Sequence, residues 1–166
     1  MEIKYIEMTG NIGLVSNSAG LCMATQDVLA SKGGTAANFV DIGGSAIHEQ
    51  IDSVLHILAS DPRIKVVFIN CYGGILNMEK LIATLRLAFA NFLDKPVVIR
   101  ALGTGTQGND EDVVLKMLGD WPRRRPIFIE QDFDKACAKA VEIAAEEEQK
   151  GADLDLESSQ QQQPLQ

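Results

Sequence analysis

The feature that most constrains the fold is a unit that recurs five times: a short apolar run, a turn of small residues, and a stretch with helical spacing. We interpret the apolar runs 12–16, 38–42, 65–70, 96–100 and 126–129 as strands. Helical spacing follows at 21–32, 45–59, 75–92, 110–118 and 132–149, with Ser45 as a candidate N-cap. Such alternation predicts a parallel sheet with right-handed crossovers and helices on both faces.

The third strand is continuously apolar at its centre, from Val66 to Ile69, as expected for a central strand covered on both faces. We therefore predict a flavodoxin-like, three-layer α/β/α domain with a five-stranded parallel sheet in the order 2-1-3-4-5. It should occupy residues 1–150. Residues 151–166 lose their apolar character, end in a glutamine run, and are expected to form a low-complexity tail that cannot bury a core.

Charge and composition exclude several classes of function. A net charge of −8 argues against a nucleic-acid partner, because phosphate backbones are bound by concentrated Lys and Arg. The sequence has no apolar run that could span a membrane and no signal-peptide pattern at its start. Cys22, Cys71 and Cys137 are far apart and lack metal-ligand spacing, so we expect interior thiols in a reducing compartment.

The candidate binding site is the edge at which the parallel strands end. Four turns of small residues are expected there, at 17–20, 43–45, 72–75 and 103–105. Each should lead into a helix N-terminus, where backbone N–H groups favour an anion. Residues 73–75 are the best candidate, because they follow a central strand and precede a long apolar helix. The alternative is that these glycines only make tight turns, and spacing alone leaves both open.

Several segments resemble succinyl-CoA synthetase β subunits in collinear order over roughly residues 5–148. GNIG at 10–13 and NSAGL at 17–21 resemble the family's "GNIG…VNGAGLAM", and ANFVDIGG at 37–44 resembles "PANFLDVGG". LASDPRIK at 58–65 is similar to "LSDPKVKA", NCYGGI at 70–75 to "NIFGGI", and PVVIR at 96–100 to "PVVVR".

This resemblance implies a role in one reaction of the tricarboxylic acid cycle. Family enzymes interconvert succinyl-CoA, phosphate and a nucleoside diphosphate with succinate, CoA and the triphosphate, carrying the phosphate on a histidine of the α subunit. The C-terminal β domain packs against α and offers a helix N-terminus to the phosphohistidine and succinate. By position, Asn17 would contact substrate, and Gly73, Gly74, Ile75 and Leu76 would form the phosphate-facing helix start. No catalytic residue or metal ligand is expected on this chain.

A chain of 166 residues is too short to contain the family's ATP-grasp domain of roughly two hundred residues. If the enzyme is active, Mg and nucleotide are therefore expected on a separate ATP-grasp chain, and the isolated chain should be inactive. The expected partners are an α subunit, a split ATP-grasp fragment and other subunits of a larger complex. The expected location is the mitochondrial matrix in a eukaryote and the cytoplasm otherwise.

Local departures bear on activity. Ser18 stands where the family has a glycine that could adopt positive φ, and Leu102 replaces an acidic residue. Ile75, Leu76, Asn77 and Met78 replace the family's "I(V/M)(R/N)C".

His48 and His56 are interpreted as surface or structural residues, and Glu146–Glu148 as a solvated helix end. The segment 121–126, with Trp121 and three arginines, is foreign to the family and should lie at the opposite edge of the sheet. It is either a solvated loop or a docking element.

Two hypotheses remain. The chain is one piece of a split succinyl-CoA synthetase, or it is a derived domain that has lost catalysis and serves as an interaction subunit of a larger, mitochondrial assembly. The glycine turn at 73–75 and Asn17 favour the first. The missing domain, Leu102, the segment 121–126 and the tail favour the second.

Overall fold

The computed structural model describes the backbone of residues 3–43, 48–104 and 125–161, and within these ranges the side chains other than those of 74–80, 103–104 and 155–161. Its elements are β1 (Lys4–Glu7), β2 (Ile12–Ser16), α1 (Ala19–Ser31), β3 (Asn38–Asp41), α2 (His48–Ser60), β4 (Val66–Asn77), α3 (Met78–Asn91), β5 (Val97–Thr104), β6 (Ile127–Ile129) and α5 (Phe133–Gln161).

The sheet confirms the predicted strand order and adds one strand. Its order is β1-β3-β2-β4-β5-β6, so the five predicted strands lie in the order 2-1-3-4-5 and pair in parallel. The additional strand β1 pairs antiparallel with β3, Lys4 opposite Asp41 and Glu7 opposite Asn38. Its apolar residues Tyr5 and Ile6 are adjacent rather than alternating, which is why the period-2 pattern of a strand is absent there.

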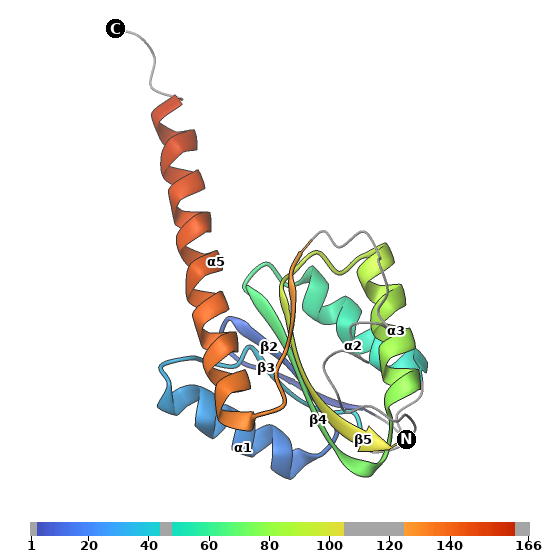
Figure 1. Ribbon diagram of the computed structural model, residues 1–166. Helices are drawn as coiled ribbons and strands as arrows, with labels where there is room; N and C mark the ends of the chain where they lie inside the picture. The colour runs from blue at the N-terminus through green and yellow to red at the C-terminus, as the bar shows by residue number, and fades with distance from the viewer. Residues whose placement is uncertain (1–2, 44–47, 105–124, 162–166) are drawn as a thin grey trace, which may run out of the picture.

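Helices cover both faces of the sheet, as predicted (Figure 1). On one face, Leu14, Phe68 and Val98 pack with residues of α1 and α5. On the other face, Val67 and Ile69 pack with residues of α2 and α3. Because alternate residues of β4 enter opposite clusters, β4 is the central, doubly covered strand that its sequence indicates.

Two predicted boundaries at the carboxyl ends of strands are wrong. Residues 73–74 do not end the third strand: β4 continues to Asn77, and α3 begins at Met78 rather than at Ile75. Likewise β5 continues to Thr104, through the predicted turn at 103–105. The two extensions stay together, since Asn77 is aligned with Thr104 beyond a register shift after Tyr72. Residues 73–76 have no aligned partner in β5, and the pairing of Asn77 with Thr104 carries β4 past the two glycines.

The last helix is much longer than predicted. It ends at Gln161 instead of about Gln149, and its C-terminal half rises beyond the body of the domain (Figure 1). The Glu146–Glu148 run is therefore in the middle of α5, and two of its members are bonded. Glu147 pairs with Arg125 and Lys150, and Glu148 accepts a hydrogen bond from Asn11. The predicted Ser45 cap, the helix at 110–118 and most of the segment 121–126 lie outside the described residues.

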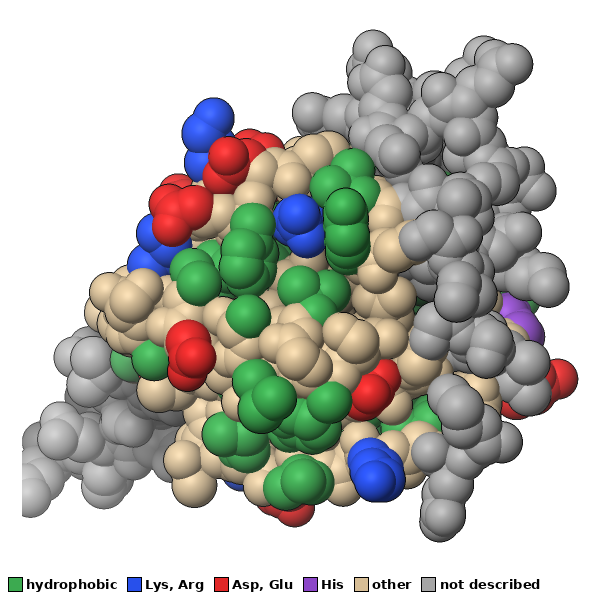
Figure 2. Space-filling model, turned by 90° about the horizontal axis from the view of Figure 1, so that it is seen from below, with side chains coloured by type: hydrophobic (Ala, Val, Ile, Leu, Met, Phe, Trp, Pro, Cys, Tyr) green, Lys and Arg blue, Asp and Glu red, His purple; other side chains and the backbone are tan. Residues whose placement is uncertain are grey.

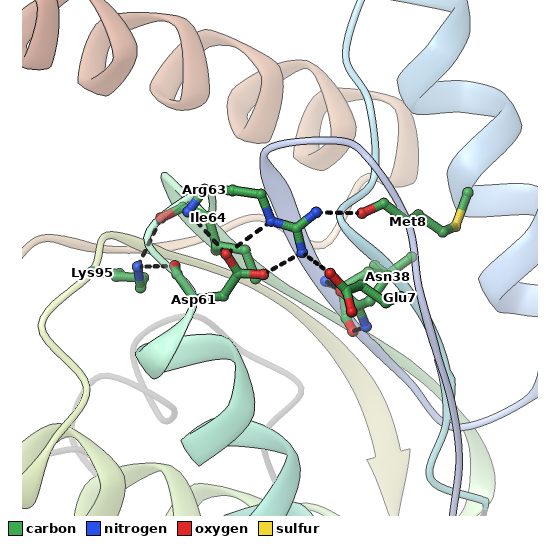
Figure 3. Close-up of polar contacts among 8 residues, drawn as sticks. Glu7, Met8, Asn38, Asp61, Arg63, Ile64 and Lys95 are labelled. Atoms are coloured by element: carbon green, nitrogen blue, oxygen red, sulfur yellow. Dashed lines mark hydrogen bonds and ion pairs between the residues drawn. The ribbon is translucent and has the colours of Figure 1, made fainter.

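An arginine ties β1 to the turn that precedes β4 (Figure 3). The guanidinium of Arg63 donates to both carboxylate oxygens of Asp61, at 3.1 and 2.6 Å, to Glu7 at 2.7 Å and to the carbonyl of Met8 at 2.9 Å. The Arg63 guanidinium holds the pKa of Asp61 below its usual value. Lys95 donates to the carbonyls of Asp61 and Ile64 on the other side of this turn. This cluster closes the edge at which the parallel strands begin.

Candidate functional site

The parallel strands end at the edge that Figure 2 views face on, toward which the β5 arrow points in Figure 1. Hydrophobic side chains gather in patches on this side, with only scattered charged groups between them. Two large apolar side chains near these strand ends are exposed, Tyr72 at 61% and Met23 at 54%. Polar residues of β2, β4 and β5 meet beneath them.

Asn17 comes directly after β2 and is almost completely buried, with 7% of its surface exposed. Its Oδ1 accepts a hydrogen bond from the backbone N–H of Tyr72, and its Nδ2 donates to the backbone carbonyl of the same residue, both at 2.9 Å. The last backbone pair between β2 and β4 is Ser16 with Asn70. The side-chain amide of Asn17 thus stands in for the peptide group that would continue this ladder.

A chain of buried hydrogen bonds joins the strand ends to α1. Ser16 Oγ donates to the Asn70 carbonyl at 3.0 Å, and Asn70 Nδ2 donates to Thr25 Oγ1 at 2.8 Å. Thr25 Oγ1 donates in turn to the carbonyl of Leu21. Ser16, Asn70 and Thr25 are fully buried, so unsatisfied polar atoms there would be costly, and these bonds satisfy them.

Arg100 completes the network from β5. Its Nη1 donates to Asn70 Oδ1 and its Nε to the carbonyl of Gln131, both at 3.0 Å. The guanidinium carbon lies 5.8 Å from the ring centroid of Tyr72 and 5.2 Å from that of Phe133. These are cation–π distances, and a planar guanidinium suits the combination of stacking and directed donation. Arg100 therefore fixes the Tyr72 ring while Asn17 holds the Tyr72 backbone.

The turn after β2 is organised differently from the expectation. Ser18 is extended, with φ −158°, so the position needs no glycine. Its Oγ accepts a hydrogen bond from the backbone N–H of Leu21 and caps α1. Gly20 lies within α1 rather than in a turn. The serine that departs from the family pattern is thus a favourable N-cap.

Of the five predicted site residues, the structure places Asn17 and Gly73 next to each other. A Cβ placed on Gly73 would lie 4.0 Å from Asn17 Nδ2, and Gly73 has φ +138°, a conformation that favours glycine. The backbones of Gly74, Ile75 and Leu76 lie in β4, whereas their side chains lie outside the described region. These three residues therefore do not form a helix N-terminus. Whether any of the five contacts a ligand stays a prediction.

The network around Arg100 was not found from the sequence. Asn70 and Arg100 were noted only as parts of two similar segments, and nothing linked them to each other or to Phe133. One signal was available: both are polar residues at the ends of apolar strands, where parallel neighbours bring side chains together.

Other reactive side chains have structural surroundings. His48 Nδ1 lies 2.7 Å from Thr84 Oγ1, and the His56 ring stacks on Phe92 at 3.5 Å, as expected for structural histidines. All three cysteines are buried, and burial raises the pKa of the Cys71 thiol to about 12. Within the described residues, His, Cys, Asp and Glu form no cluster that could hold a metal, and no helix is both long and apolar enough to cross a membrane.

A hollow of about 560 Å³ lies at the opposite edge of the sheet, between α5 and the turns that precede β2 and β3. Its lining includes Gly10, Gly34, Arg63 and Glu148. The Arg63 guanidinium is engaged by Asp61 and Glu7, and Glu148 by Asn11. The hollow therefore offers a ligand few uncommitted charges.

Comparison with known proteins identifies the family and supports the fold. A family model described as CoA-ligase matches residues 15–116. The chain is 37% identical over 145 residues to the succinate–CoA ligase [ADP-forming] subunit beta 2 of Archaeoglobus fulgidus, covering 87% of this chain and 37% of that protein. It is 34% identical over 144 residues to the hydrogenosomal beta subunit of the same enzyme from Neocallimastix frontalis, covering 86% and 31%.

Among solved structures, the apo form of a dinucleotide-forming acetyl-coenzyme A synthetase 1 from Ca. Korarchaeum cryptofilum superposes with a TM-score of 0.58. The match covers 86% of this chain and 35% of that one at 14% identity, so it supports the fold alone. The chain spans about a third of the length of the relatives that it matches.

Proposed function

Because this chain belongs to the CoA-ligase family, we propose that it is the CoA-ligase domain of a succinate–CoA ligase β-type subunit. In this role it contributes a subunit interface and a phosphate- and succinate-facing segment to the reaction succinyl-CoA + phosphate + NDP = succinate + CoA + NTP. The segment is the backbone of residues 73–76 next to Asn17.

The observation that carries this proposal is the convergence of Asn17 and Gly73 at the carboxyl edge of the sheet. Open parallel sheets bind ligands at this edge. The edge also carries an exposed tyrosine beside an arginine, and both residue types are favoured at the centres of protein interfaces. An α-type subunit docked there would bring its phosphohistidine to the strand ends.

The sequence covers about a third of the length of its relatives, so activity requires parts of the enzyme that lie outside it. We propose that Mg and the nucleotide bind to a separate ATP-grasp chain, and that the isolated chain does not turn over. A soluble compartment such as an organellar matrix fits a hydrogenosomal relative. On this basis a eukaryotic chain belongs in the mitochondrial matrix and to the tricarboxylic acid cycle.

The test is reconstitution. The full chain is used to capture partners, and the captured complex is assayed for CoA- and nucleotide-dependent formation of succinyl-CoA. The informative variant is Gly73→Val, because a branched side chain at φ +138° distorts the backbone beside Asn17. Its matched control is Gly20→Ala, where an added Cβ meets nothing within 4 Å. Loss of activity in the first variant alone is expected; equal activity in both would contradict the proposal.

A second candidate is a non-catalytic interaction subunit of a larger assembly. The protruding half of α5 favours this alternative. A solitary helix with Gly and several Asp and Ser residues has little intrinsic stability, and packing against a partner protein would stabilise it. Capture of a complex that lacks an α-type subunit, with an unrelated protein on the carboxyl edge, would decide for this alternative.

A further inference from the structure

The strand β1 lies at one end of the described sheet, so its backbone is paired on one side only. In an antiparallel ladder, successive residues direct their N–H and C=O groups alternately toward and away from the neighbouring strand. The N–H of Met8 donates to the Ala37 carbonyl at 2.7 Å, so Met8 faces β3, and so does Ile6 two residues earlier. The backbone groups of Tyr5 and Glu7 therefore point to the open side of β1.

The side chain of Ile6 is exposed beside this open backbone. Tyr5 packs against the core on the α2 and α3 face, so the alternation along a strand places Ile6 on the opposite face. There it is aligned with Phe39, which packs with the core of the α1 and α5 face. Ile6 is 58% exposed and Met8 38%, so α1 does not extend over β1. An apolar side chain on an open strand edge makes that edge a template for another strand.

The open edge of β1 is complementary to itself. A two-fold axis that runs through Ile6, perpendicular to the sheet, places a second β1 antiparallel to the first. In this register each Tyr5 exchanges both backbone hydrogen bonds with Glu7 of the other copy. Ile6 faces Ile6 of the other copy in a non-hydrogen-bonded pair, the kind in which opposite side chains lie closest. All outward-facing backbone groups of Tyr5 and Glu7 are then satisfied.

The charges of β1 favour this register over its neighbours. With the axis at Ile6, Glu7 lies opposite Tyr5 and Lys4 opposite Met8, so no like charges face each other. Moving the axis to Glu7 would oppose two carboxylates, and moving it to Tyr5 would oppose Ile6 and Lys4. Glu7 is already paired with Arg63 at 2.7 Å, which lowers the repulsion between two copies of a chain with net charge −8.

We propose that β1 is a self-association edge, at which two copies of this chain pair their β1 strands antiparallel about a two-fold axis at Ile6. The two sheets become one continuous sheet across the interface. The contact is short, so the dimer is weak and forms in a concentration-dependent way. In the sheet β1 is separated from β4 and β5 by β3 and β2, so this proposal does not depend on the proposed function.

The first experiment is sedimentation of the full chain over a range of concentrations up to about 1 mM, for wild type, Ile6→Lys and the control Leu87→Lys. Leu87 is 47% exposed on α3, beside β5 and away from β1. Two lysines facing each other at the axis repel, so Ile6→Lys should raise the dimer Kd at least about tenfold and Leu87→Lys should not. A monomeric wild type, or a dimer unaffected by Ile6→Lys, would overturn the proposal.

A cysteine variant tests the register and keeps the test decisive if Ile6→Lys does not fold. Residues facing each other in a non-hydrogen-bonded pair have Cα atoms about 4.5 Å apart, within the range of a disulfide. Ile6→Cys should therefore form a covalent dimer under mild oxidation at concentrations where Leu87→Cys does not. The three native cysteines are buried and do not compete. Equal cross-linking of the two variants would contradict pairing at Ile6.

Amide hydrogen exchange by NMR distinguishes strand pairing from any other contact between copies. Exchange at Tyr5 and Glu7 should slow as the concentration of wild type rises, because their N–H groups are bonded only in the dimer. Exchange at Ile6, whose N–H faces β3 in a single copy, should change less. A dimer in which Tyr5 and Glu7 exchange as fast as in the monomer would place the contact elsewhere and refute the proposal. So would protection of β1 that appears only when a different protein is added.

Discussion

Several single polar side chains join elements of this domain through hydrogen bonds. Asn17 and Asn38 replace peptide groups, Arg100 joins three segments, and Arg63 ties β1 to the turn before β4. Each asparagine bonds both backbone groups of one residue on a neighbouring strand, whereas each arginine bonds groups from more than one segment. Planar amide and guanidinium groups suit this use, since their donors and acceptors have fixed directions.

The Asp61 carboxylate gives a pH dependence of stability. Arg63 lowers its pKa in the folded state, so its contribution is fully present above the unfolded pKa of about 4 and is lost as the pH falls through the lower folded value. Asp61→Asn should therefore be less stable than wild type at pH 7, and the difference should shrink on acidification below about pH 4. Urea unfolding at a series of pH values measures this.

The matched variant is Glu146→Gln, at an exposed glutamate for which the described part of the chain shows no ion pair. It should not reduce stability at pH 7. A constant difference between wild type and Asp61→Asn from pH 7 to pH 2 would mean that the Arg63 contact contributes nothing to the pH dependence.

At the scale of elements, strand ends rather than helices decide the geometry of the candidate site. The pairing of β4 with β5 beyond Tyr72 moves the start of α3 to Met78. At the other edge, the turn before β2 packs so closely on the start of β3 that Gly10 has no space for a side chain. A Cβ there would lie 2.2 Å from the Thr35 carbonyl oxygen.

Two glycines should therefore respond in opposite directions to the same substitution. Gly10→Ala should lower the free energy of unfolding by at least about 2 kcal/mol, because the obstacle is backbone and cannot rotate away. Gly20→Ala, in the first turn of α1 with open space around it, should raise it by up to about 1 kcal/mol through helix propensity. Chemical denaturation of both variants checks this; similar effects of the two would contradict the packing argument.

At the scale of the whole molecule, α5 belongs to the domain for only part of its length. Its 29 residues extend roughly 44 Å at 1.5 Å per residue. Its buried residues end at Ala144, and Glu147, only 13% exposed, is held by Arg125 and Lys150. Gly151 and Leu154 still line a hollow with Asp94 and Lys95, and beyond them the helix rises away from the body (Figure 1).

Truncation after Leu154 should consequently leave the body intact. We expect the free energy of unfolding to change by less than about 0.5 kcal/mol, while the helical signal in circular dichroism falls. Glu147→Gln in the full chain should cost about 1 kcal/mol, because it weakens a partly buried ion-pair cluster. A truncated chain that no longer unfolds cooperatively would show that the protruding half stabilises the domain.

Some parts of the fold could be predicted from the sequence and others could not. The apolar core of β4 and the helix stripes followed from periodicity, because burial imposes that periodicity locally. The strand β1 lacks the alternation and was missed. At residues 73–74, glycines that normally mark a turn lie inside β4, which aligns with β5 again at Asn77 after a register shift.

The sequence alone determined the layers of this domain, the order of its five parallel strands and its family, since hydrophobic periodicity and motif order are written along the chain. Only the tertiary structure decided what Asn17 and Arg100 do. A polar side chain has several possible partners, and which of them it meets depends on segments that lie 30 to 55 residues away in the sequence. The start of α3 and the bonding of Glu147 were decided in the same way, by contacts between elements.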